Sequence, residues 1–160
     1  MRKWLEVIAV AAIAFQVWLT YSALAGPNPL PSQIPTHFDA AGNPNGWGSP
    51  SILLFLNVIT IGLYLLITVV AMFPAGFNFP VRVTEENRLR LQNTALNMIV
   101  WVKTELVCLF TVLLWSMIQA VRSGEGRLPP LLMPAFIVLI FGTVAWHLVA
   151  MIRAAVPTAE

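Results

Sequence analysis

The chain has 160 residues, of which 58% are apolar and 10% charged, and its mean hydropathy is +0.79. Soluble domains carry about a quarter charged residues, so this composition excludes an ordinary soluble domain and indicates an integral membrane protein. The net charge of +2 is too small to indicate nucleic-acid binding, and the basic residues lie beside apolar runs, where lipid headgroups are the expected partners. Cys108 is the only cysteine, so no disulfide framework and no cysteine-based metal site is expected. No cofactor is predicted.

Four segments have the roughly 20 mostly apolar residues that a helix needs to cross a bilayer. They are residues 5–25, 51–73, 101–121 and 131–152. Backbone groups in lipid must be satisfied within their own segment, and the chain lacks the repeated alternation of a membrane barrel. The predicted fold is therefore an all-α integral membrane protein, a single domain over residues 1–160 with four transmembrane helices in a bundle. The first segment is predicted to be a retained helix, because its apolar run is longer than a signal-peptide core and three further spans follow.

The distribution of basic residues predicts that both termini are cytoplasmic. With that orientation seven basic residues lie on the cytoplasmic side: Arg2, Lys3, Arg82, Arg88, Arg90, Lys103 and Arg153. Only Arg122 and Arg127 lie on the other side.

The first loop, residues 26–50, is therefore predicted to be extracytoplasmic. Its prolines and glycines stiffen the backbone and indicate an ordered structure. The run Asn43-Pro44-Asn45-Gly46 is a turn signal, and Phe38 and Trp47 are expected to anchor the loop on the helix ends. The candidate recognition residues are Pro35, Thr36, His37, Phe38, Asp39, Gly42, Gly46 and Trp47.

His37 and Asp39 have three interpretations that the sequence leaves open. They form an imidazole–carboxylate pair with a recognition or pH-sensing role, they bind a metal, or they satisfy backbone groups in a tight loop. A metal site is the least supported, because no further ligand cluster accompanies them. An enzyme is not predicted, since no nucleophile, zinc motif or phosphate-binding loop is present. An outer acid–base pair of His37 and Asp39 is the remaining enzyme hypothesis.

The inner segment, residues 74–100, begins with helix-breaking prolines and a glycine. Thr84 is a candidate helix N-cap, and the pattern after it predicts an amphipathic helix that leads into the third span. The exposed residues proposed as a surface for a cytoplasmic partner are Arg82, Glu85, Glu86, Arg88 and Arg90.

Ionisable residues within the spans cost about 2.5–3.5 kcal/mol each at mid-bilayer and therefore need an explanation. By depth, one polar cluster is expected from Glu6, Lys103, Glu105 and His147, with Glu105 and His147 as the favoured pair. It is either a proton- or ligand-sensitive site or a buried network that fixes helix register. Gln16, Asn57 and Gln119 are predicted to form interhelical or interfacial hydrogen bonds.

Two motifs carry a family resemblance. The first is Leu30-Pro31-x-x-Ile34-Pro35-Thr36-His37-Phe38-Asp39-x-x-Gly42-x-Pro44-x-Gly46-Trp47-Gly48-Ser49. The second is Phe77-Asn78-Phe79-Pro80-Val81-Arg82-Val83-Thr84-Glu85-Glu86-Asn87. Together they resemble the domain of unknown function 1648, a group of small bacterial membrane proteins, and a related domain opens the SdpI-type immunity and signalling proteins. The resemblance implies a multi-pass protein of the bacterial cytoplasmic (inner) membrane. For SdpI-type relatives, it implies resistance to a secreted peptide toxin and membrane capture of a repressor.

The leading functional hypothesis is a binding, sensing or immunity-type module. Its outer loop would contact an extracellular peptide or envelope ligand, and its inner surface a cytoplasmic regulator. The alternative is a small transporter or a transporter-accessory subunit. Besides the lipid bilayer, a second copy of the chain is a candidate partner.

Overall fold

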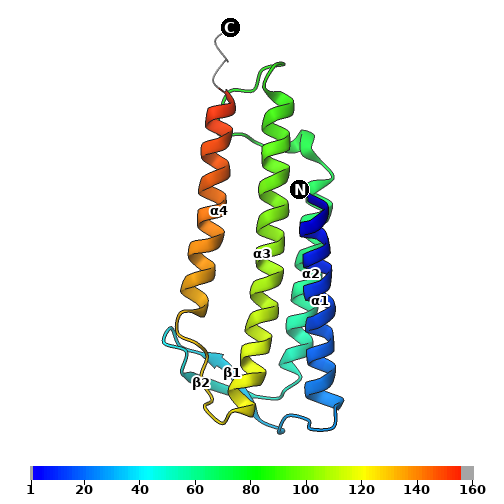
Figure 1. Ribbon diagram of the computed structural model, residues 1–160, viewed down its shortest axis with the longest axis vertical. Coiled ribbons are helices and arrows are strands. Elements are labelled where there is room, and N and C mark those ends of the chain that lie inside the picture. Colours follow the sequence, from blue (N-terminus) through cyan, green and yellow to red (C-terminus); the bar gives the residue numbers. More distant parts are fainter. Residues whose placement is uncertain (1, 156–160) are drawn as a thin grey trace.

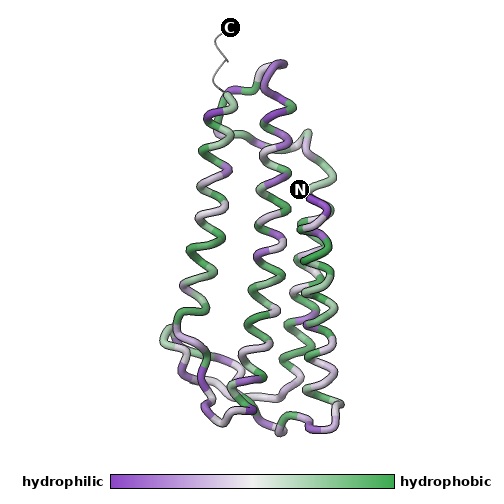
Figure 2. The backbone as a smooth tube through the Cα atoms, in the orientation of Figure 1, coloured by the Kyte–Doolittle hydropathy of each residue, from purple (hydrophilic) through white to green (hydrophobic). Residues whose placement is uncertain are grey.

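The computed structural model describes residues 2–155, which form four long helices and one small hairpin (Figure 1). In chain order the elements are α1 (Arg2–Ala25), β1 (Ile34–Phe38), β2 (Pro44–Gly48), α2 (Ile52–Ala71), the short 3-10 helix η1 (Pro74–Gly76), α3 (Arg88–Arg122) and α4 (Leu132–Ala155). The four long helices are all long and apolar enough to cross a membrane. Figure 2 shows the apolar residues spread along them and polar residues gathered toward the two ends. A multi-pass helical membrane protein is therefore confirmed.

The predicted four-helix bundle is wrong in one respect. Helices α1, α2 and α3 pack together, whereas α4 packs mainly along α3 and lies apart from the other two (Figure 1). Only 6% of the α4 span is buried, against 39% of the α3 span. Side-chain hydrogen bonds join α1 to α3 and α1 to α2 at several levels, and Thr68 of α2 bonds to Lys103 of α3. Among residues 2–155, α4 has one such bond to the other helices, from Thr143 to Glu105.

Polar side chains join the three packed helices in the half that is nearer to the hairpin. The Gln16 amide donates to the Thr60 hydroxyl at 3.0 Å and accepts from the Thr111 hydroxyl at 3.1 Å. The Asn57 amide donates to the Thr20 hydroxyl at 2.6 Å. These bonds confirm the interhelical role predicted for Gln16 and Asn57. In a lipid environment such bonds add specificity to packing that the hydrophobic effect does not drive.

The predicted amphipathic segment and the predicted third span form one continuous helix, α3. It has 35 residues, and at 1.5 Å per residue it is about 52 Å long, well beyond the roughly 30 Å of a bilayer core. The amphipathic segment is thus the first part of α3 itself, and helical structure begins at Arg88 rather than directly after Thr84. Thr84 and Asn87 exchange hydrogen bonds of 2.8 and 3.3 Å in a turn that precedes the helix. This reciprocal pair has the pattern of a capping box, so Thr84 caps the turn that leads into α3.

The apolar face of this first part of α3 packs on protein. Leu91 and Ala95 form a buried cluster with Met151 of α4, and Phe77, Phe79, Val81, Met98 and Ala154 cover it. The Arg2 guanidinium also donates to Asn97 at 2.8 Å, which ties the start of α1 to α3. The start of α1 and the end of α4 lie at this end of the molecule, opposite the hairpin (Figure 1).

Candidate functional site

The first loop folds as an antiparallel hairpin of β1 and β2, so an all-α description of the chain is incomplete. The chain reverses at Asp39–Asn43, whereas Asn43-Pro44-Asn45-Gly46, predicted as the turn, lies mostly in β2. The reason is the Asp39 carboxylate, which accepts the backbone N–H groups of Ala41 at 2.9 Å and Asn43 at 2.8 Å. Gly42 supplies the positive φ of 82° that this turn requires.

His37 and Asp39 have different partners. The His37 ring is hydrogen-bonded to the Asn45 side chain across the hairpin, and both Asp39 oxygens are used by the turn. Both side chains are exposed, and residues 2–155 contain no group of three or more potential metal ligands. Phe38 packs, as expected, on the buried apolar cluster at the hairpin end of the helices, which includes Leu53 and Leu114. Trp47 is 60% exposed and does not anchor the loop.

The hairpin is fastened to the rest of the molecule at two points. The Leu128 N–H, in the loop between α3 and α4, donates to the Gly42 carbonyl at 2.9 Å. The Leu30 N–H donates to the Ala23 carbonyl at the end of α1, at 2.8 Å. A Cβ atom on Gly42 would lie 2.3 Å from the Leu128 carbonyl oxygen, so only glycine allows this approach. Pro35 is buried in β1, and Gly46 lies directly against His37.

A cavity of about 360 Å³ lies between the hairpin and the ends of α2, α3 and α4 that are nearest to it. Its helix side is apolar and includes Phe55, Leu113 and Met117. Its hairpin side includes Thr36, His37 and Asp39. An apolar pocket of this size with a few polar groups is typical of a small-ligand site. Five of the eight predicted recognition residues therefore line one wall of a cavity: Thr36, His37, Phe38, Asp39 and Gly42. The lining does not include Pro35, Gly46 or Trp47.

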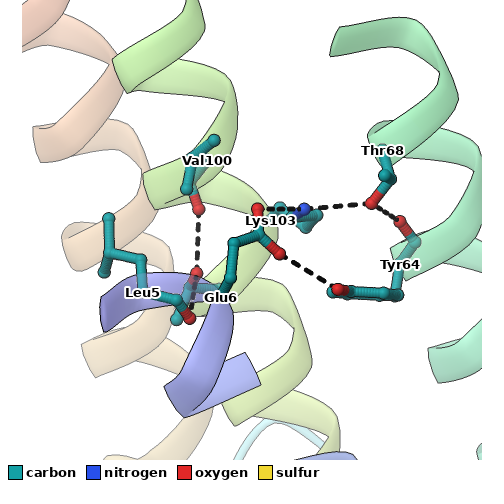
Figure 3. Close-up of polar contacts among 7 residues, drawn as sticks. Leu5, Glu6, Tyr64, Thr68, Val100 and Lys103 are labelled. Atoms are coloured by element: carbon teal, nitrogen blue, oxygen red, sulfur yellow. Dashed lines mark hydrogen bonds and ion pairs between the residues drawn. The ribbon is translucent and has the colours of Figure 1, made fainter. Parts of the chain in front are cut away.

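The predicted intramembrane cluster divides into two. In the first, Lys103 is 2% exposed and its ammonium lies 2.6 Å from Glu6 and 3.0 Å from the Thr68 hydroxyl (Figure 3). The Tyr64 hydroxyl donates to the other Glu6 oxygen at 3.0 Å, and the ammonium lies 4.5 Å from the centre of the Tyr64 ring. The buried cation therefore has an anion, a hydroxyl and an aromatic face as partners.

The second cluster lies between α3 and α4. The Thr143 hydroxyl donates to Glu105 at 2.5 Å, and the His147 ring donates from Nδ1 to the Thr143 carbonyl at 2.8 Å. Glu105 and His147 are thus linked through Thr143. Residues 103 and 105 point about 200° apart around a helix, which is why their side chains belong to different clusters.

The sequence interpretation missed Tyr64, Thr68 and Thr143. A usable signal was present, because Tyr64 and Thr68 are four residues apart, as are Thr143 and His147. That spacing places each pair on one helix face.

The charged residues proposed as a partner surface lie at the end opposite the hairpin. All of them are exposed: Arg82, Glu85, Glu86, Arg88 and Arg90. One ion pair links Arg88 to Glu85 at 3.3 Å, and because both side chains are largely exposed it leaves the surface open to a partner.

The Asp39 turn makes a testable prediction about pH. The N–H bond from the Asn43 backbone, followed by the Asn43 side chain and the Ala41 backbone, holds the pKa of Asp39 below its ordinary value of 3.8. Because the folded pKa is the lower one, the stabilisation is present above about pH 4 and is lost as pH falls through the folded pKa. In NMR titrations, we expect the Ala41 and Asn43 amide shifts to move with a midpoint below 3.8, and Asp39→Asn to abolish that movement. A midpoint at or above 3.8 would contradict the geometry.

Taken together, the fold defines a multi-pass helical membrane protein with an ordered hairpin at one end of its spans. The model of the domain of unknown function DUF1648 matches residues 7–62, from α1 through the hairpin into α2. An uncharacterized protein of Archaeoglobus fulgidus is 30% identical over 151 residues, which cover 86% of this chain and 76% of the relative. The chain belongs to the DUF1648 family. No solved structure matches it.

Proposed function

We propose that the protein is a membrane-embedded binding or sensing module whose ligand enters the cavity beneath the hairpin. The observation that carries this proposal is the apolar cavity of about 360 Å³, walled on one side by the family motif. An amphipathic ligand, such as an extracellular peptide or an envelope component, would place an apolar group against Leu113 and Met117. Burying one large apolar side chain there contributes about 1.5–3 kcal/mol.

The charge distribution supports an orientation with the hairpin outside the cytoplasmic membrane and both termini inside. The charged surface of residues 82–90 would then contact a cytoplasmic regulator. An immunity role, as in SdpI-type proteins, is supported by resemblance at the family level alone. We propose no enzymatic activity, because His37 and Asp39 are engaged by Asn45 and by the turn.

Filling the cavity is expected to block binding. Leu113→Trp adds an indole to the apolar wall, and we expect it to weaken binding of a dansyl-labelled Leu/Lys amphipathic peptide, added to intact cells, by at least about tenfold. The matched control is Leu66→Trp, at an exposed apolar position on α2, which should bind as the unmodified protein does. Equal affinity in all three proteins, or no saturable binding from outside, would contradict the proposal.

A small transporter or an accessory subunit of one is the second candidate. The observation in its favour is the presence of Lys103 and Glu105, both buried within a span. Intramembrane ionisable residues commonly mark ion or substrate paths. The largely exposed α4 face would then serve as the contact between two copies of the chain.

A further inference from the structure

Glu105 differs from the other intramembrane ionisable residues in having an unsatisfied oxygen. It is 6% exposed, and its Oε1 accepts from Thr143. Its Oε2 is buried and has no hydrogen-bond partner among residues 2–155. Lys103 and Glu6 form an ion pair with each other, so among the acidic side chains within the described spans Glu105 is the one without a cationic partner. A buried carboxylate oxygen without a partner is costly, and a cation that reached it would remove that cost.

The surroundings of Glu105 are suited to an organic cation. A groove of about 610 Å³ lies along the α3–α4 seam, and Glu105, Thr143 and His147 line it together. Because the Thr143 carbonyl can only accept, the His147 Nδ1 carries a proton there, and Nε2 of the neutral ring is an acceptor. The indoles of Trp101 and Trp146 also line the groove, and indole faces attract organic cations.

The remaining wall of the groove is apolar. It is formed by Val138, Leu139 and Gly142 of α4. An anion would be repelled by Glu105, and an uncharged apolar molecule would leave Oε2 unpaired. Residues 2–155 hold no cluster of three metal-ligating side chains, so the acceptors here do not make a metal site.

We propose that the α3–α4 seam binds a lipophilic monocation, an ammonium group carried on an apolar chain. The ammonium pairs with Glu105 Oε2, beside His147 and the two indoles, and the chain lies against Val138 and Leu139. This site is separate from the cavity beneath the hairpin, and its occupancy does not depend on the function proposed for that cavity.

The test is equilibrium binding of radiolabelled dodecyltrimethylammonium to the protein in phosphatidylcholine nanodiscs, with empty nanodiscs subtracted. We expect dodecylammonium to compete at least about tenfold better than uncharged dodecanol, because only the cation satisfies the carboxylate. Glu105→Gln should remove this preference. The matched control Glu125→Gln, an exposed carboxylate between α3 and α4, should retain it.

Binding by Glu105→Gln equal to that of the unmodified protein would overturn the proposal. If Glu105→Gln does not fold, the proposal is tested by the competition experiment on the unmodified protein alone. Equal competition by dodecanol and dodecylammonium then overturns the proposal. Nanodiscs of phosphatidylethanolamine distinguish the sources of the ammonium group. Weaker probe binding in them identifies an aminolipid as the occupant, and unchanged binding identifies a soluble amine; both results support an ammonium site.

Discussion

Replacing Glu6 with alanine is expected to lower the free energy of unfolding by about 3 kcal/mol, because it leaves a buried ammonium without its anion. Lys103 is 2% exposed, so its ammonium depends on protein partners, of which Glu6 is the anion. The Tyr64 hydroxyl loses its acceptor at the same time. The measurement is unfolding in mixed micelles by titration with a denaturing detergent.

A double variant distinguishes a stranded charge from simple loss of packing. Glu6→Ala with Lys103→Met removes both charges, and it should be clearly more stable than Glu6→Ala alone. The matched control is Glu85→Ala, which breaks the exposed pair with Arg88 and should cost less than about 1 kcal/mol. If the single and double variants prove equally unstable, the charge of Lys103 is not the cause.

The second large effect is expected at Gly42. In Gly42→Ala the new Cβ would lie 2.3 Å from the Leu128 carbonyl oxygen, at a backbone φ of 82°. The left-handed conformation alone costs about 1–2 kcal/mol, and the collision must also break the bond from the Leu128 N–H. We expect a total loss of roughly 2–4 kcal/mol, with hydrogen exchange concentrated in the hairpin and in residues 126–130.

The control for this substitution is Gly62→Ala in α2. Apart from the adjacent backbone of α2, no atom lies within 4 Å of the position of its Cβ, and the residue is in a helix interior. Alanine there should be neutral or stabilise the helix by up to about 1 kcal/mol. Equal stability of the two variants would show that the hairpin is not held at Leu128.

Hydropathy and length predicted the helices well, because a bilayer leaves a spanning segment few alternatives. Counting residues also placed Glu6 level with Lys103, and Glu105 level with His147, along the helices. It did not predict their partners, because the direction in which a side chain points relative to neighbouring helices depends on packing. For that reason one predicted cluster became two.

The separation of α4 also left no signal in the sequence, since its hydropathy resembles that of the other spans. The hairpin was missed for a different reason. Asn43-Pro44-Asn45-Gly46 has the composition of a turn, but Asp39 binds two backbone N–H groups and Gly42 accepts from Leu128, and these contacts place the reversal earlier. The local Asp39 turn, together with one contact from the distant Leu128, outweighed the turn preference of residues 43–46.

The continuity of α3 has a mechanical consequence. Its 35 residues include no proline and no glycine, so the helix has no residue that favours a kink or hinge. Met117 at one end borders the hairpin cavity, while Leu91 at the other end is held by the cluster beside the charged surface. A displacement of α3 along its axis at Met117 would therefore also displace Arg90, so the cavity and the charged surface would be mechanically coupled through one helix.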